Sequence, residues 1–83
     1  MLQTIAINNT LAAINDNIAQ GFAAHDAGDA EGKLDHARVA FLLIGELREI
    51  ADSSRDALDL QTFFEVVAAY ENATRALMEL LLA

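Results

Sequence analysis

The chain has 83 residues, room for one domain, and carries 13 acidic residues against five basic ones, a formal net charge of −8. A charge of this sign repels phosphate backbones and anionic lipid surfaces, so the composition disfavours binding to nucleic acid or to a membrane. The absence of cysteine excludes a domain stapled by disulfides and a zinc site built on thiolates.

The first predicted helix covers residues 3–26. Its apolar side chains recur at spacings of three and four, which places them in one narrow stripe like a coiled-coil seam. The stripe consists of Thr4, Ile7, Leu11, Ile14, Ile18, Phe22 and His25. Several asparagines on the other faces are poor helix formers, so packing must hold this helix together. Gly28 follows the predicted helix and is well placed to end it in the left-handed conformation that glycine commonly takes at this position.

The second predicted helix covers residues 30–51, with Asp29 as its N-cap. Its apolar residues span an arc of roughly 180°. The arc consists of Ala37, Ala40, Phe41, Leu43, Ile44, Leu47, Ile50 and Ala51. So wide an arc contacts two neighbours, which predicts that this helix is central. Val39 and Leu42 lie outside the arc and are the first candidates for exposed apolar contact.

The third predicted helix covers residues 57–82 and carries two apolar rows. Its candidate N-caps are Ser53, Ser54 and Asp56. The main row consists of Leu60, Phe63, Val66, Val67, Tyr70, Ala73, Leu77 and Leu81. The second row consists of Leu60, Phe64, Val67, Met78 and Leu82. One neighbouring helix does not cover both rows, so Phe64 and Leu82 are the second set of candidates for an interface.

These elements predict an all-α fold, an antiparallel up-down-up three-helix bundle that forms a single domain over residues 1–83. The short connections make successive helices antiparallel neighbours. A second copy of the chain could complete the three helices to a larger bundle by dimerisation.

Apolar residues make up 54% of the chain, which is more than a small domain buries easily. For this mass, the folded surface is about 4,800 Å² and the unfolded surface about 12,900 Å², so only roughly 63% is buried on folding. Apolar residues that remain exposed in a patch usually mark an interaction site. The candidate partner-binding residues are Val39, Leu42, Phe64, Val67, Met78 and Leu82. The first residues do not resemble a signal peptide, and we expect a cytoplasmic protein.

Polar residues gather around the first predicted turn. They are His25, Asp26, Asp29, Asp35 and His36. This set could bind a divalent metal, and a histidine in a helical bundle could carry a phosphoryl group. The spacing fits no standard metal motif, however, and residues 27–29 break the helix within three residues of His25. We therefore expect no metal, no cofactor and no catalysis, with His25 at the edge of the core, bonded to a nearby carbonyl or carboxylate.

Several local patterns follow one another along the chain. They are Leu11, Ala12, Ile14 and Ile18, then Gly28-Asp29 with Lys33, then alanines and bulky aliphatic residues over 37–47, then Leu58-Asp59, then Ala69-Tyr70-Glu71 and Arg75-Ala76-Leu77. In this order they resemble the flagellin export chaperones of the FliS type. The resemblance implies a helical chaperone that holds the C-terminal segment of flagellin in apolar grooves.

The chain departs from that family at both ends. It has no counterpart of the family's N-terminal segment or of its final helix, so it resembles three helices of a four-helix core. The absent helix would leave a groove lined by the second apolar rows of the second and third helices. A client helix or a second copy of the chain could fill that groove.

The sequence thus predicts a non-enzymatic helical module that binds a protein partner. Its most specific form is a flagellar-type export chaperone or co-chaperone that binds an amphipathic, flagellin-like client helix. One alternative is a structural homodimer with no client. A second alternative is a histidine phosphotransfer or metal-binding bundle that uses His25 and His36.

Overall fold

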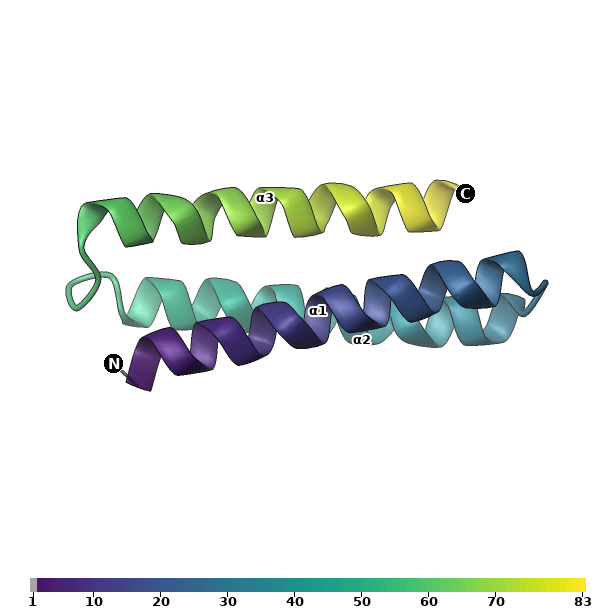
Figure 1. Cartoon of the computed structure of the whole chain (residues 1–83), viewed down its shortest axis with the longest axis horizontal. Helices are drawn as coiled ribbons and strands as arrows, with labels where there is room; N and C mark the ends of the chain where they lie inside the picture. The colour runs from purple at the N-terminus through teal and green to yellow at the C-terminus, as the bar shows by residue number, and fades with distance from the viewer. Residues whose placement is uncertain (1) are drawn as a thin grey trace.

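The computed structural model describes residues 2–83, with side chains from Thr4 onward, and these residues form three helices. They are α1 (Leu2–Asp26), α2 (Ala30–Ser53) and α3 (Leu60–Leu82). Successive helices run antiparallel, and α3 lies along the closely packed pair of α1 and α2 (Figure 1). The bundle measures 44 × 19 × 14 Å. The predicted all-α, up-down-up three-helix bundle is therefore confirmed.

The turn between α1 and α2 forms at the predicted glycine. Gly28 has a φ of +75°, in the left-handed region. The N–H of Asp29 donates to the carbonyl of Ala24 at 2.8 Å, and the N–H of Gly28 donates to His25 at 3.1 Å, which is the Schellman pattern of helix ends. The Asp29 side chain then accepts from the N–H of Gly32 at 2.9 Å and caps α2 as predicted. One short turn thus ends α1 and starts α2.

The second turn differs from the prediction. Helix α2 continues to Ser53, two residues beyond the expected end. Ser54 closes it, because its N–H donates to the carbonyl of Ile50 at 3.0 Å and its side chain is buried. The two serines therefore belong to the end of α2 and do not cap α3. Serine at a helix end satisfies either terminus, so the sequence did not distinguish the two roles.

Helix α3 begins at Leu60, not at residue 57. The N–H groups of Ala57 and Leu58 donate to the carbonyl of Ser54, and this extra turn delays the helix. Its N-cap is Asp59, not the predicted Asp56, and its carboxylate accepts from the N–H of Thr62 at 2.7 Å. That backbone hydrogen bond lowers the pKa of Asp59. Asp59 thus satisfies one of the donors that a helix start leaves free.

The core takes side chains from all three helices. Its buried apolar members are Ile7, Ile14, Ile18, Ala37, Ala40, Ile44, Leu47, Ala51, Val66, Ala73, Leu77 and Leu80. The largest fully buried side chains are Ile14, Leu47 and Leu80, one from each helix. The stripes predicted for α1 and α2 supply most of this core. The polar ends of the α1 stripe, Thr4 and His25, are exposed.

Several large apolar residues depart from the predicted core. Phe41, Leu60 and Leu81, which were expected on apolar faces between helices, are exposed. Leu80 was outside both predicted rows of α3, yet it is 0% exposed. The buried face of α3 is therefore turned toward Ala73, Leu77 and Leu80. Periodicity gives the faces of a helix that are apolar, but the positions of its neighbours decide which of them is covered.

Leu80 is buried against a glycine of α1. A Cβ added at Gly21 would lie 2.5 Å from the Leu80 Cδ2 atom, whereas no described atom of another segment lies within 4 Å of a Cβ added at Gly45. Both glycines lie inside helices, where alanine is intrinsically favoured by about 1 kcal/mol. Gly21 therefore makes room for the Leu80 side chain between α1 and α3, and Gly45 faces open space.

We predict opposite effects of the same substitution at these two sites. Gly21→Ala lowers the free energy of unfolding by about 1 kcal/mol, because the overpacking of about 1–3 kcal/mol outweighs the gain in helix propensity. Gly45→Ala raises it by about 0.5–1 kcal/mol. Urea and thermal unfolding of dilute protein, followed by circular dichroism, measure both values. Equal stabilisation by the two substitutions would contradict the packing of the Leu80 side chain on Gly21.

Candidate partner-binding surface

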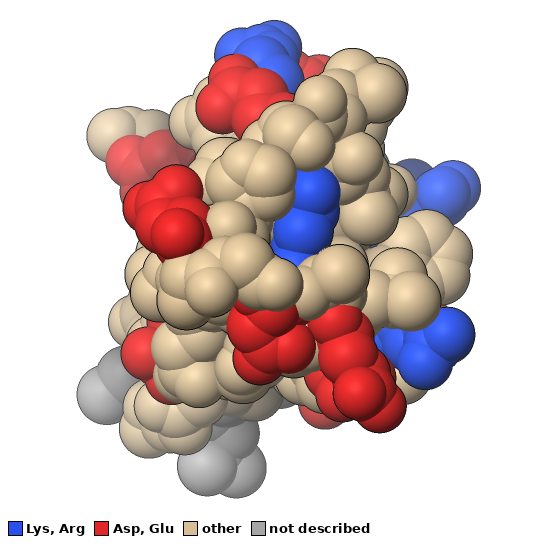
Figure 2. Space-filling model, turned by 90° about the vertical axis from the view of Figure 1, so that its right-hand side faces the viewer, with Lys and Arg blue, Asp and Glu red and all other residues tan. Residues whose placement is uncertain are grey.

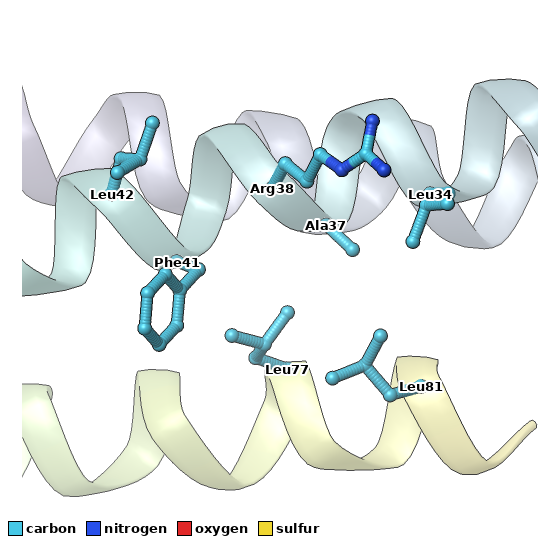
Figure 3. Close-up of a pocket in the computed structure, with 7 residues that line it drawn as sticks. All are labelled: Leu34, Ala37, Arg38, Phe41, Leu42, Leu77 and Leu81. Carbon is cyan, nitrogen blue, oxygen red and sulfur yellow. The ribbon is translucent and has the colours of Figure 1, made fainter.

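An apolar groove runs between α2 and α3. Its lining at one end consists of Leu34, Ala37, Arg38, Phe41, Leu42, Leu77 and Leu81, which enclose a hollow of about 400 Å³. Phe41 points from α2 toward α3, and Leu77 and Leu81 point back toward α2, with the α1 ribbon behind α2 (Figure 3). Phe41 is 67% exposed and Leu42 is 69% exposed. Large apolar side chains thus meet solvent in one continuous recess.

The groove continues along α2 past Gly45. There a second hollow of about 640 Å³ is lined by Phe41, Leu42, Ile44, Gly45, Glu46, Arg48, Glu49 and Tyr70. A third lies beyond it, lined by Leu47, Arg48, Ala51, Asp52, Phe63, Val66, Val67 and Tyr70. Together the three hollows follow α2 from Leu34 to Asp52, a length of about 27 Å at 1.5 Å per residue. The groove is therefore long enough for about five turns of a helix.

Charged residues of both signs border this groove, namely Arg38 and Arg48 with Glu46, Glu49 and Asp52. Residues 2–26 of α1 contain no lysine or arginine, whereas Arg38 and Arg48 of α2 line the groove. At the end of the bundle where α3 stops, basic side chains lie at the top, in the centre and on the right of the view, and acidic ones lie at the top, on the left and below (Figure 2). The groove is therefore bordered by charges of both signs.

The two arginines of the groove have weak ion pairs within α2. Arg38 lies 3.7 Å from Asp35, and Arg48 lies 4.0 Å from Asp52, with all four side chains mostly exposed. Exposed pairs of this kind stabilise a helix by only about 0.3–0.5 kcal/mol. Both arginines can therefore exchange these partners for a carboxylate on a bound molecule.

The structure distributes the six predicted partner-binding residues over several surfaces. Leu42 lines the groove and Val67 lines its far hollow. Met78 borders a shallow recess beside Tyr70, and Phe64 borders another with Leu60.

The other two predicted residues lie apart. Val39 follows the buried Ala37 by two positions, which at 100° per residue turns it to another side of α2. Leu82 is the last residue of α3 and is 82% exposed. The six residues are all exposed, but they do not form one patch.

Four large apolar residues of the groove were not among the predicted partner-binding residues. They are Leu34, Phe41, Leu77 and Leu81. Three of them belonged to the predicted inter-helix faces, at the edges that α2 and α3 turn toward each other. The available signal was the width of the α2 arc, which exceeds what α1 and α3 cover. When the apolar arc of a helix is wider than its neighbours can cover, side chains at the edge of the arc are exposed. Phe41 lies at that edge.

The two histidines do not form a site with the acidic residues near them. The Nδ1 atom of His25 lies 3.4 Å from the Nζ atom of Lys33, which also donates to the carbonyl of Ala83 at 3.2 Å. The Nδ1 atom of His36 lies 3.1 Å from the amide oxygen of Asn17. The expected carbonyl or carboxylate partner of His25 is thus replaced by Lys33. Among the residues whose side chains are described, no group of three or more metal-ligating residues comes together.

In comparisons with known proteins, the chain matches no family, no curated protein and no solved structure. The resemblance to flagellin export chaperones therefore depends on the sequence pattern alone. Over the described part of the chain, the helices are too short or too polar to cross a membrane.

We predict that the groove contributes little to the stability of the single chain. Phe41→Ser should change the free energy of unfolding of dilute protein by less than about 0.5 kcal/mol, since phenylalanine and serine have similar helix propensities and the ring is mostly exposed. Leu47→Ala, in the core, should cost about 2–5 kcal/mol. Urea unfolding compares the two variants. A loss above about 2 kcal/mol for Phe41→Ser would mean that the ring is buried within the chain.

Proposed function

We propose that this chain is a non-enzymatic helical module that binds a partner protein in the groove between α2 and α3. The observation that carries the proposal is the exposure of Phe41 and Leu42 beside Leu77 and Leu81 in one apolar recess. Contiguous apolar surface of this kind is characteristic of interaction sites. Binding would remove these side chains from water at about 25 cal/mol for each Å² covered.

The shape of the groove favours a helix as the bound element. Two antiparallel helices form its walls, and a further helix laid along them completes the geometry of a four-helix bundle. The groove follows α2 for about 27 Å, which matches a helix of roughly 18 residues. Such a helix would place apolar residues at positions i, i+3, i+4 and i+7 into the groove.

The most specific form of the proposal is a flagellar-type export chaperone or co-chaperone in the cytoplasm. It is supported by the order of sequence patterns from Gly28 to Leu77 and by the open place for a fourth helix. The net charge of −8 favours a client that carries basic residues beside its apolar face, because complementary charges speed association.

Capture of a partner from a lysate of the source organism tests the proposal. The full chain, immobilised by an N-terminal tag, should retain a protein that mass spectrometry identifies. Leu42→Asp should lower the retained amount at least about tenfold, since it buries a carboxylate in an apolar contact. In the flagellar form of the proposal, the retained protein is a flagellar one.

Phe64→Asp is the matched control, because Phe64 is also an exposed apolar residue but lies in a different recess of α3. This variant should retain the same protein as the unaltered chain. Equal retention by the unaltered chain and by Leu42→Asp would show that the groove is not the binding site.

A further inference from the structure

The surface of α2 carries a protruding side chain next to a recess. Leu42 is 69% exposed. Gly45 forms part of the floor of the neighbouring hollow of about 640 Å³, where a Cβ added to the glycine would have no described atom of another segment within 4 Å. The two residues are three positions apart, about 4.5 Å along the helix axis. A helix with this pattern can place its own leucine into the recess of an identical helix.

We propose that the helix that occupies the groove is α2 of a second copy of this chain. The two α2 helices run antiparallel about a two-fold axis that passes between Leu43 and Ile44. Leu42 of each copy then packs over the partner subunit's Gly45, and Phe41 and Tyr70 border the contact. This inference rests on the proposed helix-binding function of the groove and names its partner.

Two charged residues of α2 are placed symmetrically about the same two-fold axis. Arg38 and Glu49 flank the pair of Leu42 and Gly45, and the four positions step by four, three and four residues, which is the spacing of one helix seam. Arg38 and Glu49 also have their midpoint between Leu43 and Ile44. The antiparallel pairing therefore brings Arg38 of each copy opposite the partner subunit's Glu49, twice in one interface. Opposite charges placed in this way fix the register of an interface.

The ends of the paired helices carry further charges. Asp35 of one copy comes opposite the partner subunit's Asp52, but each carboxylate has an arginine of its own helix beside it. These are Arg38 at 3.7 Å from Asp35 and Arg48 at 4.0 Å from Asp52. Arg48 keeps its contact with Asp52 and thereby reduces the repulsion at the two ends, while Arg38 turns from Asp35 to the partner subunit's Glu49 and fixes the register.

The single chain exposes more surface than a compact protein of its mass, and the excess is similar to the area that a dimer interface covers on each partner. The chain exposes 5489 Å², roughly 700 Å² more than the about 4,800 Å² expected for a compact protein of its mass. A standard protein interface buries about 800 Å² on each partner. A second copy on the groove would thus remove about the excess that the single chain shows. A self-complementary interface with a two-fold axis is also the commonest form of association.

A charge exchange tests the inference. Sedimentation equilibrium of the purified full chain at low salt should give a dimer, and Arg38→Glu or Glu49→Arg should each raise its Kd at least about tenfold, because like charges then face each other twice. The double variant Arg38→Glu/Glu49→Arg should return the Kd to within about threefold of the original value. Circular dichroism should show unchanged helix content, since both side chains are on the surface.

Arg55→Glu is the control for net charge, because it changes the charge by the same amount in the turn before α3 and should leave the Kd unchanged. A chain that stays monomeric at millimolar concentration overturns the inference, and so does a double variant that fails to recover. A monomer that still captures another protein through Leu42 would leave the proposed function intact. A dimer with the predicted charge dependence that captures no other protein would contradict the client and support the second copy.

Discussion

Three helices in an up-down-up bundle cannot cover all the apolar surface of this chain, and that constraint determines the rest of the structure. Helix α1 packs closely along one side of α2, and Ala40 of α2 is fully buried. The Leu80 side chain of α3 packs on Gly21 of α1, so the buried face of α3 carries Ala73, Leu77 and Leu80. The flanks that α2 and α3 turn away from α1 remain uncovered, and they form the groove.

The sequence predicted the three helices, their antiparallel order and the first turn, because each has a local cause. Gly28 ends α1 and Asp29 caps α2 through contacts within a few residues. The predicted start of α3 was wrong because Ser54 and Asp56 are both acceptable N-caps when the local sequence alone is considered. The turn that precedes Asp59 delays the helix, so Asp59 is the N-cap instead. The burial of Leu80 was missed because it depends on a glycine in another helix, 59 positions away in the chain.

The candidate site could be predicted only in part for the same reason. Amphipathic periodicity correctly indicated that Leu42 is exposed and that α2 and α3 carry excess apolar surface. The same periodicity predicted that Phe41 and Leu81 lie between helices. It gives the width of an apolar face, but it does not show that no further helix covers the edge of that face. Burial at the edge of a face is decided by the tertiary arrangement, and a sequence pattern of one helix does not contain that information.

The two proposals place two partners on one groove, so a client helix and a second copy would compete for Phe41 and Leu42. Methyl NMR with a soluble paramagnetic probe tests most directly whether the groove is the covered surface. At high protein concentration the methyl groups of Leu34 and Leu42 should be protected from the probe, while those of Leu60 and Leu82 stay accessible, and dilution should expose the first pair. Equal accessibility of all four residues at every concentration would contradict the account.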